Sequence, residues 1–169
     1  MLSDENKGTE NQMSKVEKLA ETSQQNDEKF MRQALAEAER ALVRGEVPIG
    51  AVVVCGGAVI GRGHNLVESL SDATAHAEMQ AITAAGGTLG GKYLNECTLY
   101  VTVEPCVMCA GACNWSQIGR LVYGAPDPKR GFTLFGGNAL LHPRTEVTAG
   151  VLAGECGEPV KRFFKKLRG

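Results

Sequence analysis

Apolar side chains recur every three or four residues in one early stretch of the chain, which is the period of a single helix face. These positions are Met31, Ala34, Leu35, Ala38, Ala41 and Leu42. Asp27 precedes the pattern with a side chain that can cap a helix, and Gly45 ends it. The spacing therefore predicts a helix that begins at Asp27 and ends near Gly45.

Residues 1–26 carry no such pattern. They are mostly polar and contain no aromatic residue, a composition that offers too little apolar surface for a core. We therefore expect residues 1–26 to form a disordered N-terminal extension, and residues 27–169 to form one domain.

Runs of β-branched residues predict the strands. Residues 47–54 and 58–63 are two such runs, and Cys55-Gly56-Gly57 between them is typical of a hairpin. Residues 98–103 have the composition of a well-buried strand, and residues 120–123 and 146–152 are two further candidates.

Proline and glycine mark the remaining helices. A helix is predicted over residues 75–85, where Gly86-Gly87 would stop it, and Pro105 opens another that extends to about Ser116. Pro159 should reset the last helix, so that only residues from Val160 onward are regular. The order of elements predicts an α/β protein: a three-layer α/β/α sandwich with a central mixed five-stranded sheet.

Charge and hydropathy limit which partners and which cellular location the sequence predicts. Eighteen Lys and Arg oppose 19 Asp and Glu, so the net charge of −1 gives no global positive field, and a surface for nucleic acid must be local. No apolar run approaches the roughly 18 residues of a membrane span. The first residues lack the basic and apolar segments of a signal peptide. We expect a soluble, cytoplasmic protein, away from membranes, whose six cysteines are reduced.

Two short segments carry the candidate chemistry, TAHAE at 74–78 and EPCVMC at 104–109. Cys106 and Cys109 are three residues apart at the start of a predicted helix, so they lie on one face. A helix N-terminus also favours the thiolate form that zinc binds. With His76 they make three ligands and leave the fourth tetrahedral position open for water. The pattern indicates a catalytic site with one Zn²⁺ per subunit.

Glu78 is then free to move protons. It can take a proton from the water, pass it to a ring nitrogen and protonate a leaving amine, as the replacement of an exocyclic amine by oxygen requires. Two alternatives are a thioredoxin-like redox pair and a closed structural zinc with Cys113 as fourth ligand. The second would leave Glu78 without a role, and Cys113 fits better as a small buried apolar residue. His64 and His142 lack the spacing of metal ligands.

The pattern H-x-E…P-C-x-x-C is the signature of zinc-dependent nucleobase deaminases. Over about residues 28–168 the chain resembles bacterial tRNA-specific adenosine deaminases, of the cytidine/deoxycytidylate deaminase superfamily. The resemblance is carried by VPIGAVVV (47–54), GRGHN (61–65), TAHAEMQAI (74–82), TLYVTVEPCVMCAGA (98–112) and SQIGRLVYGAPDPKRG (116–131). It implies a cytidine-deaminase-like fold, a homodimer, and hydrolytic conversion of adenosine to inosine at the wobble position of tRNA.

The resemblance also implies roles for individual residues. It makes His76, Cys106 and Cys109 the zinc ligands and Glu78 the proton shuttle. The substrate-binding residues that it implies are Asn65 at the flipped base, Asp127 near the ribose, Lys129 and Arg130 on the same loop, and Ala77. Structural alternatives remain for two of them, because Asn65 can shape a turn and Asp127-Pro128 has turn chemistry of its own.

Local basic residues make an RNA substrate plausible. Lys129, Arg130 and Arg144 join a basic tail that contains Lys161, Arg162, Lys165, Lys166 and Arg168. Such a stripe suits the phosphates of a tRNA anticodon stem-loop whose bases are splayed out. Phe163 and Phe164 predict that the tail is an amphipathic helix with its aromatic rings docked on the body. Trp115 is expected near the mouth of the pocket.

Two other functions compete with this interpretation. A deaminase of guanine, or of another free nucleobase or nucleotide, would use the same fold and zinc site. A non-catalytic RNA-binding subunit would keep zinc for structure, but the presence of Glu78 disfavours it.

Overall fold

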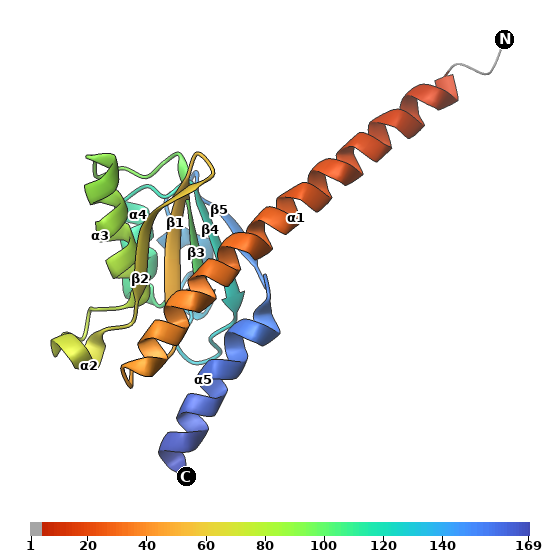
Figure 1. The fold of residues 1–169 in the computed structure, drawn as a ribbon. Coiled ribbons are helices and arrows are strands. Elements are labelled where there is room, and N and C mark those ends of the chain that lie inside the picture. Colours follow the sequence, from red (N-terminus) through yellow and green to blue (C-terminus); the bar gives the residue numbers. More distant parts are fainter. Residues whose placement is uncertain (1–4) are drawn as a thin grey trace.

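The computed structural model describes residues 5–169, with side chains from Lys15 onward. Its centre is a five-stranded sheet in the order β2-β1-β3-β4-β5 (Figure 1). The strands are β1 Gly50–Cys55, β2 Ala58–His64, β3 Cys97–Val103, β4 Arg120–Ala125 and β5 Glu146–Ala149. β1 runs antiparallel to β2 and to β3, whereas β3, β4 and β5 are parallel. The predicted mixed sheet is confirmed, and so is the hairpin at Cys55–Gly57.

Helices cover both faces of the sheet (Figure 1). Helices α3 (Ala77–Leu89) and α4 (Val107–Trp115) enclose one core, in which Val53, Leu99 and Leu121 are fully buried. Helices α1 (Glu5–Val43) and α5 (Ala153–Arg168) enclose a second core around Met31, Val52 and Cys156. The three-layer α/β/α sandwich is therefore confirmed. The short elements are α2 (Val67–Leu70), η1 (Phe132–Leu134) and η2 (Gly137–Leu140).

The first helix is much longer than the pattern predicts. α1 already begins at Glu5 and runs through residues 5–26, so the predicted helix start at Asp27 is wrong. The side chains of residues 15–26 are all exposed, and this part of α1 projects beyond the sheet (Figure 1). Asp27 is the first buried position, and its carboxylate accepts bonds from Arg120 at 2.7 Å and from Tyr100 at 2.8 Å. The boundary between extension and domain stays a prediction, and residues 1–4 lie outside the described residues.

Other element ends also differ from the predictions. α3 continues through Gly86-Gly87 and stops at Gly90, whose φ of 72° suits a left-handed C-cap. β1 begins only at Gly50, after Pro48, which has no N–H for the ladder. β5 ends at Ala149, because Gly150 turns the chain with a φ of 84°.

α5 begins at Ala153, so the predicted start at Val160 is wrong. Burial of Cys156 against β4 fixes the first turn of α5 ahead of Pro159. Pro159 lies inside the helix, where its missing N–H removes one backbone hydrogen bond and its ring crowds the carbonyl group of Glu155. Among the described residues, no helix is long and apolar enough to cross a membrane.

Glycines let α3 lie unusually close to the sheet. A Cβ atom on Gly63 would overlap the carbonyl oxygen of Ala77, and one on Gly61 would overlap that of Ala81. The two glycines of β2 therefore set the height of α3 above the sheet. Since Ala77 is the first residue of α3, Gly63 fixes the helix end that carries His76 and Glu78.

Candidate metal and substrate site

The predicted site residues gather where three strands end. The pairing of β1 with both neighbours makes β2 and β3 point the same way, and β4 is parallel to β3. Asn65 follows β2, Glu104 follows β3, and Asp127 follows β4 by two residues. Helices α3 and α4 also begin at this edge. The carboxyl ends of strands that run in one direction are a common place for ligand sites in α/β proteins.

Three candidate ligands meet at the first turns of α3 and α4. His76 and Cys106 occupy the residues just before the two helices, and Cys109 lies in the first turn of α4. Nδ1 of His76 is 3.6 Å from Sγ of Cys106 and 3.5 Å from Sγ of Cys109. All three ligand atoms lie within 4.8 Å of one another. One nitrogen and two sulfurs at this spacing fit a single zinc ion.

The thiol chemistry agrees with this donor set. A hydrogen bond from the Cys109 thiol, aided by one with His76, lowers the pKa of Cys106 to about 4 despite partial burial. Cys106 is therefore a thiolate at neutral pH, which is the form that binds metal. Hydrogen bonding to Cys106 raises the pKa of His76 and, together with burial, that of Cys109.

Cys113 does not belong to this group. It is fully buried in the core beneath α3 and α4, and burial raises the pKa of its thiol. The metal-ligating cluster within the described residues consists of His76, Cys106 and Cys109. The geometry thus favours an open three-ligand site over the closed site with Cys113. None of the six cysteines, all within the described part of the chain, is drawn in a disulfide.

Glu78 lies in the first turn of α3, two residues after His76, and only 4% of it is exposed. Burial raises the pKa of its carboxyl group, although contact with the Cys109 thiol opposes that shift. Burial thus favours the protonated form of this carboxyl group, and a carboxyl group can act as general base when ionised and as general acid when protonated. This environment suits the shuttle role that the sequence predicts.

A cavity of about 250 Å³ lies beside these residues. Its lining includes His76, Glu78 and Cys106, and four of the five predicted substrate-binding residues: Asn65, Ala77, Asp127 and Arg130. Lys129 is exposed and is not part of the lining. The structure therefore places Asn65 and Asp127 at one cavity with the candidate metal ligands.

The turn chemistry of Asp127 is also present. Its carboxylate accepts hydrogen bonds of 3.0 Å from the backbone N–H groups of Lys129 and Arg130. The same side chain thus shapes the loop that brings Arg130 to the cavity. The backbone N–H of Asp127 itself donates 2.9 Å to Glu104.

Two buried glutamates that the sequence analysis missed hold the cavity walls. Glu104 is 5% exposed and also accepts from the N–H and hydroxyl groups of Thr133, so it fastens the loop after β4. Glu46 is 1% exposed and accepts from the N–H groups of Ser69 at 2.6 Å and Glu68 at 3.2 Å. Both glutamates line the cavity. Because their partners are mostly backbone groups far away along the chain, no local sequence motif marks these two glutamates.

Two expectations about aromatic residues are wrong. Trp115 lies away from the cavity: it is 85% exposed and lines a separate hollow with Lys92, Tyr93 and His142. In α5, Phe164 is 42% exposed and packs edge-on against the half-buried Phe163, so this ring does not dock on the body. The basic side chains of α5, from Lys161 to Arg168, are all exposed.

Comparison with known proteins agrees with the geometry. Residues 24–125 match the family model for the cytidine and deoxycytidylate deaminase zinc-binding region. The tRNA-specific adenosine deaminase of Bacillus subtilis is 47% identical over 146 residues, which cover 84% of this chain and 91% of that protein. The protein of the same name from Aquifex aeolicus is 46% identical, over 83% of this chain and 95% of that protein.

Solved structures show the same fold. A structure from a study of A-to-I editing by tRNA:A34 deaminases has a TM-score of 0.72 and 44% identity, and covers 77% of this chain and 97% of its own. The guanine deaminase of Nitrosomonas europaea has a TM-score of 0.69 and 25% identity, over 80% of this chain and 83% of its own.

Proposed function

Because this chain belongs to the cytidine and deoxycytidylate deaminase family, we propose that it is a zinc-dependent adenosine deaminase acting on the wobble position of tRNA. The observation that carries the proposal is the meeting of His76, Cys106 and Cys109 beside the buried carboxyl group of Glu78. His76, Cys106 and Glu78 line one cavity.

In this proposal His76, Cys106 and Cys109 hold the zinc. When bound, zinc supplies the Lewis acidity that makes water a nucleophile near neutral pH. Cys106 contributes as a thiolate, because its pKa is lowered to about 4. The ligands sit at the starts of two helices that are packed on one sheet face, so their spacing is fixed by the fold rather than by a flexible loop.

Glu78 moves the protons. Its carboxylate takes a proton from the attacking water and delivers it to the adenine ring nitrogen next to the attacked carbon. It then takes the second proton, from the hydroxyl group newly bonded to that carbon, and gives it to the amine, which departs as ammonia when the C–N bond breaks. The net change replaces the exocyclic amine by oxygen and gives inosine. Burial raises the pKa of Glu78 and thereby stabilises the protonated form that this sequence needs.

The walls of the cavity bind the nucleotide. Asn65, 7% exposed, offers an amide that can both donate to and accept from the edge of a flipped base. Asp127 and Arg130, on the loop after β4, line the part of the cavity that we assign to a ribose and its phosphate. Lys129 and the exposed basic side chains of α5 are assigned to the phosphates of the stem-loop outside the cavity.

Two observations favour tRNA over a free base. The relatives with 46% and 47% identity over 83% and 84% of this chain are tRNA-specific adenosine deaminases. The guanine deaminase of Nitrosomonas europaea has 25% identity, and that of Bacillus subtilis has 40% over only 59% of this chain. The exposed cations of α5 can bind the phosphates of an RNA, whereas a small neutral purine has no phosphate for them to bind. We further propose, from the same family likeness, that the chain is a homodimer and that it acts in the bacterial cytoplasm. Analytical sedimentation would measure the oligomeric state.

The test is an incubation of the zinc-loaded protein with an anticodon stem-loop that has adenosine at the wobble position. Free guanine and cytidine are parallel substrates, and products are identified by mass. Inosine at the wobble position alone is expected. Turnover of guanine with intact RNA would keep the zinc assignment and replace the substrate.

Charge reversal of Lys161, Arg162, Lys165 and Lys166 tests the role of α5. Each lost phosphate contact should lower the slope of log affinity against log salt by about 0.7–0.9. Stem-loop binding should weaken while zinc content stays unchanged. Equal binding and an equal salt slope would assign this helix to structure alone.

A further inference from the structure

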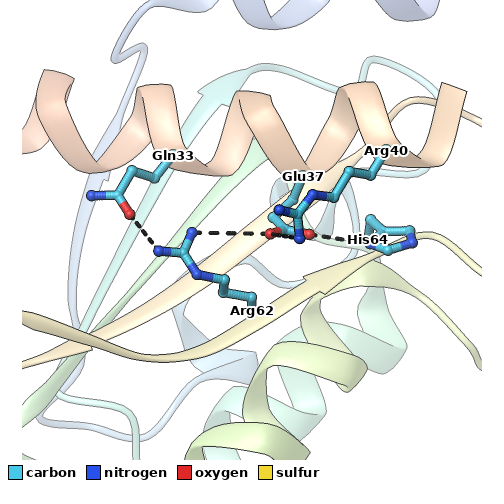
Figure 2. Close-up of polar contacts among 5 residues, drawn as sticks. All are labelled: Gln33, Glu37, Arg40, Arg62 and His64. Atoms are coloured by element: carbon cyan, nitrogen blue, oxygen red, sulfur yellow. Dashed lines mark hydrogen bonds and ion pairs between the residues drawn. The ribbon is translucent and has the colours of Figure 1, made fainter. Parts of the chain in front are cut away.

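A polar cluster joins α1 to the end of β2, on the face of the sheet away from α3 (Figure 2). Glu37 lies at its centre with a side chain that is 3% exposed. Its Oε2 is 3.1 Å from Nδ1 of His64, and its Oε1 is 3.1 Å from a guanidinium nitrogen of Arg40. Among the described residues, none of the cluster lines the substrate cavity.

The contacts of Glu37 divide into an inner and an outer set. The side chains of Arg40 and Arg62 are 67% and 45% exposed, and Arg62 is 3.9 Å from the carboxylate and bonded to Gln33 at 2.7 Å. Ion pairs in contact with water contribute little. His64 is only 17% exposed, so its contact with Glu37 is the protected one.

This contact is the one side-chain hydrogen bond of the imidazole ring among the described residues. Nε2 of His64 is buried and has no hydrogen-bond partner among the residues that the structure describes. Nδ1 therefore makes the ring's hydrogen bond, and its partner is the buried carboxylate of Glu37 on a different element. Loss of this one bond would release the side chain that ends β2.

His64 stands between two residues that serve the site. Successive side chains of a strand point to opposite faces, so His64 meets α1 while Gly63 lies against the first turn of α3. The next residue is Asn65, whose N–H donates to the carbonyl of Ile49 at 3.1 Å and whose side chain lines the cavity. The end of β2 is thus held from both faces, one residue before the substrate amide.

We propose that the Glu37–His64 pair is a positioning device for Asn65, and that His64 is a positioning residue that acts on the substrate only through Asn65. The inference rests on the proposed function, in which Asn65 binds the target base. A binding amide must be held to about 0.5 Å. The Asn65 side chain donates to Glu46 at 3.5 Å, and His64, anchored to the buried carboxylate of Glu37, holds the backbone from which that side chain projects.

The experiment is a double-variant cycle on the zinc-loaded chain with the wobble-adenosine stem-loop as substrate. His64→Leu should lower kcat/KM about tenfold, the worth of about one hydrogen bond. In the Asn65→Ala background His64→Leu should cost nothing more, because its effect passes through Asn65. An equal loss in both backgrounds would overturn the proposal, since it would mean a general structural defect.

Matched variants separate positioning from packing. His64→Asn places an amide nitrogen near the position of Nδ1 and should restore most of the lost activity. Arg62→Leu removes a side chain from the same strand and face and should leave kcat/KM within about twofold of the wild type. Failure of the asparagine to rescue, or an equal loss from Arg62→Leu, would contradict a specific role for His64.

A second readout does not depend on activity. In ¹⁵N NMR spectra of the zinc-loaded protein, the side-chain amide signals of Asn65 should move in His64→Leu, return in His64→Asn and stay in place in Arg62→Leu. Unmoved signals in His64→Leu would overturn the proposal. A wild-type chain that leaves the stem-loop unchanged would count against the proposed function alone, and the amide signals would still decide the positioning.

Discussion

The floor and the walls of the cavity are built in different ways. The floor, defined as His76, Glu78 and Cys106 with the fully buried Cys109 beside them, takes its geometry from the first turns of two helices. The walls, defined as residues 65–69 and 127–133, are loops that include the start of the short helix α2 and part of η1, and Glu46 and Glu104 hold them by their backbone N–H groups. The floor has its chemistry in its own side chains, whereas the walls depend on carboxylates from elsewhere in the chain.

This difference separates catalysis from placement. A change in the floor should remove chemistry and leave the rest of the fold intact. A change beneath the walls should loosen substrate contacts and cost stability, because buried N–H groups lose their acceptors. The variants below are chosen to test that division.

Glu78→Gln should have the largest effect. The amide keeps the shape of the side chain but does not take up a proton, so kcat should fall on the order of 10²–10⁴-fold. Zinc per chain, measured by atomic emission, should equal that of the wild type. Loss of zinc from Glu78→Gln would mean that Glu78 is a zinc ligand, like His76, and not a proton shuttle.

Glu104→Ala should affect stability first. It removes the acceptor of the Asp127 N–H and of both Thr133 donors, and the unfolding free energy should drop by about 3 kcal/mol in denaturant titrations. Activity on the stem-loop should fall through KM, with zinc still bound at saturating metal. Glu104→Gln, which keeps an acceptor oxygen, is the matched control with a smaller loss. Unchanged stability would show that Glu104 does not hold this wall.

Gly63→Ala tests the support of the floor. The added Cβ would overlap the carbonyl oxygen of Ala77, and the displacement of α3 should lower the unfolding free energy by about 1–3 kcal/mol. Gly87→Ala is the converse control, because nothing lies within 4 Å of its added Cβ and alanine favours the helix by about 1 kcal/mol. Both are read as changes in Tm. Equal shifts of one sign would contradict the close packing of β2 on α3.

The smallest effect concerns pH. Burial raises the pKa of Glu46, but hydrogen bonds from Ser69 and Glu68 outweigh it and hold the pKa below the ordinary 4.5. The carboxylate therefore stabilises the fold above pH 4.5, and this contribution is lost as the pH falls through the lowered pKa. The stability gap between the wild type and Glu46→Gln should shrink from about pH 7 to about pH 3. A stability gap that grows on acidification would mean that the fold raises the pKa of Glu46 rather than lowering it.

The same contrast explains what the sequence could predict. His76, Cys106 and Cys109 were found because their residue types and spacing leave few other uses, and the structure brings them within 4.8 Å. Their roles as ligands, and that of Glu78 as shuttle, stay predictions. Glu46, Glu104 and Glu37 escaped notice because each acts on partners distant along the chain, which no local pattern records.

Element boundaries failed for a related reason. Asp27 has the side chain of a helix cap, yet in the fold its carboxylate pairs with Arg120, 93 residues away, and the helix continues past it. Pro159 predicts a helix start, yet burial of Cys156 secures the turn before it. In both places a tertiary contact outweighs a local preference of about 1–3 kcal/mol.

The most direct test of the account is inosine formation in a single turnover of the stem-loop, measured against zinc bound per chain. Metal is removed with a chelator and returned in steps. The yield at the wobble position should rise in proportion to bound zinc and level off at about one ion per chain. Glu78→Gln should bind zinc equally and form inosine on the order of 10²–10⁴-fold more slowly. Inosine from the zinc-free chain, or from Glu78→Gln at the wild-type rate, would contradict the account.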